Sequence, residues 1–126
     1  MIAIQDILAL HIASIEKFGG AHGIRDLGLL ESAVARPFQT FGGEELYPHP
    51  IDKAAALCES LIVNHPFTDG NKRIGFIALA ALLLEYGLKL TATQQEAYDT
   101  MISVSTGQLR FEGLVDWLKG NVVQVG

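Results

Sequence analysis

Residues 65–84 read HPFTDGNKRIGFIALAALLL and join a short polar loop to a long apolar run. The loop contains an imidazole, a carboxylate, an amide and two cations, and Pro66 and Gly70 mark it as a loop rather than a helix interior. The run from Ile74 to Leu84 is apolar on every side of a helix, a pattern typical of a helix that is buried all round. We therefore expect a helix from about Asn71 to Tyr86 at the centre of the fold, with the loop at its N-terminus.

Helical spacing of apolar residues extends outward on both sides of this stretch. It predicts helices over five further ranges: 4–18, 27–36, 51–65, 94–107 and 111–119. Breakers such as Gly19-Gly20 and Pro37 end them, and Thr93-Gln94-Gln95-Glu96 has the form of a capping box. No segment shows convincing strand alternation, and residues 120–126 are expected to pack weakly. The predicted fold class is therefore all-α: one domain over residues 1–126, a compact bundle of about six helices around one buried central helix.

The composition argues against several classes of protein and of binding partner. The chain has 126 residues and a formal net charge of −5, which disfavours a sequence-independent nucleic-acid binder because such a protein presents a basic face. Cys58 is the single cysteine, so neither an intrachain disulfide nor a cysteine-based metal site is expected. The apolar run is shorter than the roughly 20 residues that span a bilayer, and the N-terminus lacks the basic region of a secretory signal. We expect a soluble, cytoplasmic protein.

The loop joins the end of one expected helix at His65 to the start of the next near Gly70. Backbone N–H groups at a helix start have no partners within the helix, and the helix dipole there favours negative charge, so this junction can bind a phosphate. Gly70 lets the backbone approach an anion closely. Lys72 and Arg73 are unfavourable at a helix N-terminus, and two cations in succession suggest a bound anion that compensates them. Asp69 is suited to Mg²⁺ beside that phosphate.

His65 completes a set of groups for transfer chemistry. An unperturbed imidazole titrates at about pH 6.5, so it can remove a hydroxyl proton near neutral pH. Together with the anion and Mg²⁺ sites, it predicts phosphoryl or nucleotidyl transfer from a Mg–nucleotide to a hydroxyl. Single residues have structural alternatives, because Asp69 could cap the helix and Lys72 and Arg73 could be solvated surface charges. Their joint occurrence in one loop favours a site.

Two other regions allow two interpretations each. His11 lies on the apolar stripe of the first helix, where a hydrogen-bonded core or groove histidine is the more common role. The stretch from Phe38 to Tyr47 places aromatic residues around Gly42-Gly43. It is either a surface loop anchored by aromatics or a flap beside a site, since loops on rigid scaffolds often carry binding. The sequence leaves these two possibilities open.

Residues His65 to Phe76, HPFTDGNKRIGF, resemble the motif H-P-F-x-(D/E)-G-N-G-R-x-x-R of the Fic/Doc superfamily, and within it the death-on-curing (Doc) toxins. Further segments resemble the same family: Leu10-His11, Gly19-Gly20, Asp26 to Pro37 and Thr40 to Gly43. Two positions depart from the Fic motif, because its second glycine is Lys72 and its final arginine is Phe76. Both departures are similar to what Doc proteins show.

The resemblance implies a Fic/Doc-like fold and a Doc-type kinase, with ATP and Mg²⁺ as cofactors. It implies His65 as general base, Asp69 as Mg²⁺ ligand, and Asn71, Lys72 and Arg73 as phosphate-holding groups beside Gly70. The implied function is the toxin of a type II toxin–antitoxin system. Such a toxin phosphorylates a serine or threonine hydroxyl, with elongation factor Tu as the expected target, and so blocks translation. The stretch from Phe38 to Tyr47 is then the expected flap for the target.

The resemblance also implies a partner. Many Fic enzymes carry an inhibitory pattern (S/T)-x-x-x-E-(G/N), and this sequence has no such match, so restraint is expected from an antitoxin whose C-terminal helix fills a groove near the site. Direct binding to nucleic acid or to a membrane is not expected. Two alternatives stay open: a Fic-type adenylyltransferase, and a catalytically silent helical binding module. The intact His65 and Asp69 argue against the silent module, because pure binding needs neither a base nor a metal ligand.

Overall fold

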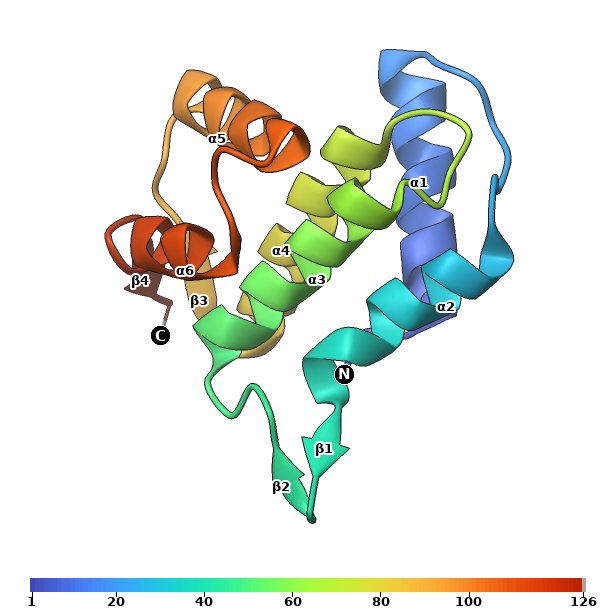
Figure 1. Cartoon of the computed structure of the whole chain (residues 1–126). Coiled ribbons are helices and arrows are strands. Elements are labelled where there is room, and N and C mark those ends of the chain that lie inside the picture. The colour runs from blue at the N-terminus through green and yellow to red at the C-terminus, as the bar shows by residue number, and fades with distance from the viewer. Residues whose placement is uncertain (126) are drawn as a thin grey trace.

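In the computed structural model, which describes residues 1–125, helices α3 (Pro50–Asn64) and α4 (Asn71–Glu85) lie side by side at the centre of the fold (Figure 1). A Cβ atom on Gly75 would lie 2.7 Å from Cγ1 of Ile62, so a glycine at this position of α4 allows the two helices to approach closely. The six-residue loop between them, residues 65–70, is the polar loop of the sequence motif.

The all-α prediction is confirmed, but one detail of it is wrong. α3 is buried without interruption from Lys53 to Ile62, whereas Leu84 on α4 is 57% exposed. Helix α4 is therefore not buried on every side, and α3 shares the centre of the bundle with it. The all-round apolar sequence of α4 includes a face that the chain itself leaves partly uncovered.

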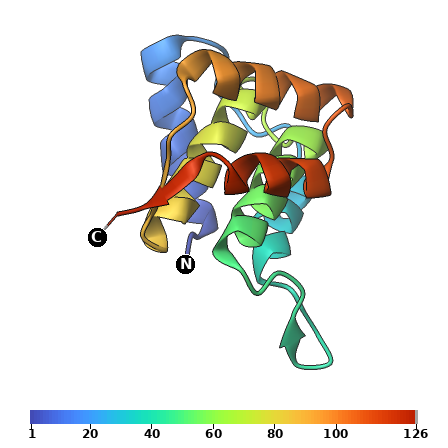
Figure 2. The ribbon, with the colours of Figure 1, turned by 90° about the vertical axis from the view of Figure 1, so that its left-hand side faces the viewer.

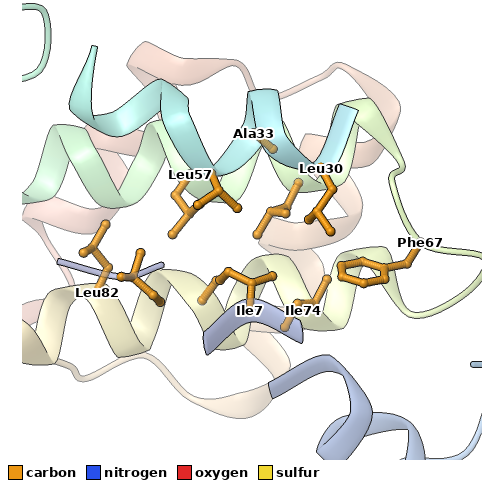
Figure 3. Close-up of a cluster of buried hydrophobic side chains, with 11 residues drawn as sticks. Ile7, Leu30, Ala33, Leu57, Phe67, Ile74 and Leu82 are labelled. Atoms are coloured by element: carbon orange, nitrogen blue, oxygen red, sulfur yellow. The ribbon is translucent and has the colours of Figure 1, made fainter. Parts of the chain in front are cut away.

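The remaining helices cover this pair from two sides (Figures 1 and 2). One side carries α1 (Ile4–Phe18), α2 (Leu27–Ala35) and the 3₁₀ turn η1 (Arg36–Phe38), and the other carries α5 (Gln94–Thr106) and α6 (Phe111–Lys119). Each side has its own core. Figure 3 shows the first core, which includes Ile7, Leu30, Leu57, Phe67 and Ile74. The second core includes Leu79, Leu83, Met101, Leu114 and Leu118.

Two small antiparallel pairs of strands contradict the expectation that the chain has no strands. Strand β1 (Thr40–Phe41) pairs with β2 (Glu44–Glu45), and β3 (Leu88–Leu90) pairs with β4 (Val122–Gln124). Strands of two or three residues are too short for alternation to appear in a sequence. The tail up to Val125 is held by this strand pairing and by the Val125 N–H, which donates to the carbonyl of Gly87. Its weak packing is as expected, because Val123 and Val125 are about half exposed; Gly126 lies outside the described residues.

Most helix ends agree with the sequence prediction to within one or two residues. The capping box is present at α5, where the Glu96 N–H donates to Oγ1 of Thr93 over 3.1 Å and the Thr93 N–H donates to the Glu96 carboxylate over 3.2 Å. None of the helices in residues 1–125 combines the length and the apolar character needed to cross a bilayer.

Candidate active site

The polar loop begins at a residue with an unusual backbone. His65 ends α3 with φ 53° and ψ 53°, and within residues 1–125 it is the one non-glycine residue with a positive φ. Pro66 disfavours a right-handed helical backbone at the residue before it, so α3 cannot continue through His65. The loop ends at Gly70, which is also left-handed (φ 75°) and precedes the first residue of α4.

The interior of the loop is held by Asn71 and His11. The side-chain amide of Asn71 accepts from the Phe67 N–H and donates to the Phe67 carbonyl, each over 3.0 Å, and Asn71 is only 4% exposed. The Phe67 ring is buried and stacks on the ring of His11 with centroids 3.7 Å apart. His11 Nε2–H donates to the Asp69 carbonyl over 2.8 Å. The expectation of a hydrogen-bonded core histidine is confirmed, and Asn71 has only its backbone N–H left for an anion.

The segment from Gly19 to Asp26 runs along the loop and lies beside it in Figure 1. The N–H groups of Arg25 and Asp26 donate to the Pro66 carbonyl, and the Thr68 N–H donates to the Gly23 carbonyl. Arg25 also reaches past Pro66, donating from Nε to the His65 carbonyl over 2.6 Å. Apart from the helix stop at Gly19-Gly20, no role was predicted for this segment from the sequence, although its three glycines, all with positive φ, signal a special backbone.

Asp69 is fixed by backbone donors. The Ala21 N–H donates to its Oδ2 over 3.0 Å, and the Gly70 N–H donates to its Oδ1 over 2.8 Å. These bonds lower the pKa of Asp69 below its ordinary value, with smaller contributions in the same direction from the charges of Arg73 and His11. A Cβ atom on residue 20 would lie 2.8 Å from Oδ2, so Gly20 is required for this approach.

The surroundings of Asp69 fit Mg²⁺ in one specific way. Each carboxylate oxygen accepts one N–H and keeps a lone pair for a metal. Residues 1–125 contain no group of three or more His, Cys, Asp or Glu side chains that could enclose a cation. A site with one carboxylate, completed by phosphate oxygens and water, is the kind that Mg²⁺ uses, because it keeps several of its waters.

Cations and backbone donors gather at the start of α4. The N–H groups of Asn71, Lys72 and Arg73 precede Ile74, whose N–H is the first to bond back to the helix, to the Gly70 carbonyl. Arg73 donates from Nη1 to the Gly19 carbonyl over 3.0 Å, and its guanidinium lies 5.3 Å from the Phe18 ring centroid. Within residues 1–125, Lys72 is exposed and its ammonium has no ion-pair partner.

Two hollows meet at this helix start. One has a volume of about 520 Å³ and extends from the loop to α5, with an apolar wall that includes Phe18, Phe76, Tyr98, Met101 and Ile102. The other, of about 580 Å³, is more polar and reaches Ser105, Thr106 and Arg110. His65, Asn71 and Lys72 line both hollows. A group held at Lys72 could therefore be approached from either side.

The same loop identifies the family. Residues 2–83 match the family model described as Fic/DOC family, which is more than half of the chain. The chain belongs to the Fic/DOC family. It is 42% identical over 105 residues to Toxin Doc of Mycolicibacterium smegmatis, covering 82% of this chain and 81% of that protein. It is 25% identical over 118 residues to Protein kinase doc of Escherichia phage P1, covering 94% and 92% of the two chains. The resemblance inferred from the motif is confirmed.

The Fic/DOC match includes the loop but ends at Leu83, before the helix that forms the far wall of the hollows. Tyr98, Met101 and Thr106 come from α5, so the sequence motif alone indicated neither hollow. In the sequence these residues have the pattern of an ordinary amphipathic helix, and only their packing against α4 brings them to the site.

The stretch from Phe38 to Tyr47 lies away from the site. It forms the β1–β2 hairpin at the N-terminal end of α3, whereas His65 is at the C-terminal end (Figure 1). At about 1.5 Å per residue, the 15 residues of α3 separate the two by about 22 Å. The expectation that this stretch is a flap beside the site is wrong, and the surface loop anchored by aromatics is what the structure has.

Proposed function

We propose that this Fic/DOC protein is the toxin of a type II toxin–antitoxin system and a kinase that transfers the γ-phosphate of Mg-ATP to a serine or threonine hydroxyl. Its proposed target is elongation factor Tu, whose phosphorylation would block translation in the cytoplasm. One observation carries the proposal: Lys72, which has no ion-pair partner among the described residues 1–125, lies between two hollows at a helix start, and His65 lines the same hollows. The names Toxin Doc and Protein kinase doc of the two relatives support it.

In the proposed reaction, His65 takes the proton of the target hydroxyl. The hydroxyl oxygen then attacks the γ-phosphorus, and the bond to the bridging oxygen breaks to leave ADP. The backbone N–H groups of Asn71 to Arg73 and the Lys72 ammonium stabilise the charge on the transferred group. Asp69 would hold Mg²⁺, which supplies charge neutralisation on the phosphates when bound.

Lys72 also favours phosphoryl transfer over adenylyl transfer. The Fic motif has glycine at this position, which leaves room for neighbouring phosphates against the backbone, whereas the lysine stem fills part of that space. Its ammonium is a strong point charge suited to a single terminal phosphate. Phe76, where the Fic motif has its final arginine, contributes an apolar ring to the first hollow instead of a phosphate contact.

The decisive experiment follows the phosphates. Incubation of the protein and elongation factor Tu with Mg-ATP labelled at either the α or the γ position should move only the γ label, and mass spectrometry should find a phosphate-sized adduct. An AMP-sized adduct would establish the adenylyltransferase instead. If neither label moves to elongation factor Tu but the γ label moves to another protein in a cell extract, the kinase holds and the proposed target does not.

The proposed antitoxin would cover the apolar wall of the first hollow. Phe18 and Tyr98 on this wall are 59% and 63% exposed, and they line one hollow together, as the apolar residues of an interaction site do. A partner helix with an apolar face would bury them and close the approach to Lys72. We expect the C-terminal segment of the antitoxin to compete with Mg-ATP in calorimetric titrations. Independent binding of the two would separate the antitoxin groove from the nucleotide site.

A further inference from the structure

Within the described part of the chain, no hydrogen bond to the imidazole itself orients the ring of His65. Within residues 1–125 the His65 imidazole has no hydrogen-bond partner and its residue is exposed. A general base is commonly aimed by a hydrogen bond to its second nitrogen. The direction of this ring must therefore come from the backbone that carries it, which is left-handed and unfavourable for a residue with a Cβ atom.

Arg25 is the side chain that holds this backbone. Its Nε donates to the His65 carbonyl over 2.6 Å and its Nη2 donates to the Asn64 carbonyl over 2.9 Å. Its own N–H donates to the next carbonyl, that of Pro66, over 2.7 Å. Three successive carbonyls around His65 are thus bound by one residue, which lies 40 positions earlier in the chain.

The chemistry of a guanidinium suits this task. Carbonyls at the end of a helix lack partners within the helix, and a cation there is favoured by the helix dipole. The planar fork of arginine can donate to two carbonyls at once in a fixed geometry, which a lysine ammonium cannot reproduce. Arg25 itself is exposed, so its contact with the loop does not serve to fill the core.

We propose that Arg25 is a positioning residue for His65: it locks residues 64–66 so that the imidazole faces the anion site at the start of α4. This role rests on the proposed function, in which His65 is the base. Removal of Arg25 should reduce the rate of transfer without weakening Mg-ATP binding, because the phosphate and metal groups are on Asp69 and α4. Misplacement of a catalytic group by about 1 Å can cost about 10²-fold in rate.

The test compares Arg25→Met and Arg25→Lys with the wild-type protein. We expect kcat for phosphoryl transfer to fall about 10²-fold in Arg25→Met, by less in Arg25→Lys, and the Kd for Mg-ATP to stay unchanged. Added guanidinium ions should restore part of the rate to Arg25→Met. Asn64→Ala is the matched control, because it removes a hydrogen bond at the same helix end, from Nδ2 to the Leu29 carbonyl, without touching the His65 carbonyl.

A second measurement does not depend on activity. The NMR chemical shifts of the His65 Cα and Cβ report a left-handed backbone, and they should move in Arg25→Met but not in Asn64→Ala. An unchanged kcat, or unchanged His65 shifts in a folded Arg25→Met variant, would overturn the role of Arg25. If wild-type protein transfers no phosphate at all, the proposed function fails, while the shifts still decide whether Arg25 holds His65. If Arg25→Met does not fold, the same two measurements on Arg25→Lys decide the question.

Discussion

The two ends of α3 each carry an irregular loop with aromatic residues and glycines, yet their charges are arranged in opposite ways. At the hairpin end, each buried or half-buried cation has a carboxylate partner. Arg36 lies 2.8 Å from Glu59, and Lys53 lies 2.8 Å from Glu45. The Arg36 guanidinium also lies near two aromatic rings, 5.4 Å from the ring centroid of Tyr47 and 5.5 Å from that of Phe111.

At the motif end, Arg25, Lys72 and Arg73 have no carboxylate partner within residues 1–125. Arg25 and Arg73 donate to backbone carbonyls, Lys72 is unpaired, and Asp69 accepts from backbone N–H groups. Charges that neutralise each other hold a structure together and leave nothing for a ligand. Cations left without counter-ions beside free N–H groups make a site for an anion. The contrast predicts that substitutions at the two ends separate activity from stability.

The largest effect is expected at His65. His65→Asn should reduce phosphoryl transfer by about 10²–10⁴-fold, the usual contribution of a general base. Asparagine tolerates a left-handed backbone, so the melting temperature should stay close to that of the wild-type protein. The matched control is His49→Asn at the other end of α3, where asparagine is a good N-cap. Equal rates for His65→Asn and His49→Asn would remove His65 from the mechanism.

A stability effect of similar size is expected at the hairpin end. Glu59→Ala leaves Arg36 without this carboxylate partner, although only 25% of the Arg36 side chain is exposed. Breaking a fully buried pair costs roughly 3–5 kcal/mol, and partial exposure of Arg36 reduces our expectation to about 2–3 kcal/mol of unfolding free energy. Urea denaturation measures this loss. Transfer per folded molecule should not change, and a lost rate with unchanged stability would contradict the contrast between the two ends.

Substitution of Lys72 should lower activity without lowering stability, the reverse of Glu59→Ala, and with a smaller effect. Lys72→Met keeps the aliphatic stem and removes the charge, so phosphoryl transfer should fall at least about 10-fold, by loss of charge stabilisation on the moving group. The ligand-free protein should become slightly more stable, by about 0.3–1 kcal/mol at most, because a cation is unfavourable at a helix start. Thermal melts without nucleotide, set beside initial rates, check both signs. A variant that is less stable and equally active would assign Lys72 to the fold.

The sequence predicts the features that depend on neighbouring residues better than the contacts between distant segments. Helix periods, breakers and the capping box at Thr93 gave the elements, because these signals are local. The groups at the start of α4 were also predictable, since they follow one another in the chain. The contacts of Arg25 and Ala21 with the loop were not, because they join segments that are 40 or more positions apart.

The hairpin shows why loop composition misleads. Phe41, Gly42 and Gly43 suit a flap beside a site as well as a surface turn, and only the direction of α3 decides between them. Its strands of two residues leave no alternation to detect. Asn71 is a second case: its type suits a phosphate, but its amide is bound to both backbone groups of Phe67.

The smallest predicted effect concerns Asp69, whose carboxylate accepts hydrogen bonds from the loop backbone and is also the proposed Mg²⁺ ligand. Its pKa is lowered, first by the Ala21 and Gly70 N–H bonds, from the ordinary aspartate value of 3.8. The ionised form therefore stabilises the folded state at pH values above the pKa of Asp69 in the unfolded chain, which is about 4. This contribution is lost as the pH falls through the lower pKa of Asp69 in the folded state. The unfolding free energy of wild-type protein should thus fall relative to Asp69→Asn only below about pH 4. At pH 7, Asp69→Asn should keep most of its stability but lose stabilisation by Mg-ATP. A variant that loses stability yet gains as much from Mg-ATP as the wild-type protein would make Asp69 a loop anchor rather than a metal ligand.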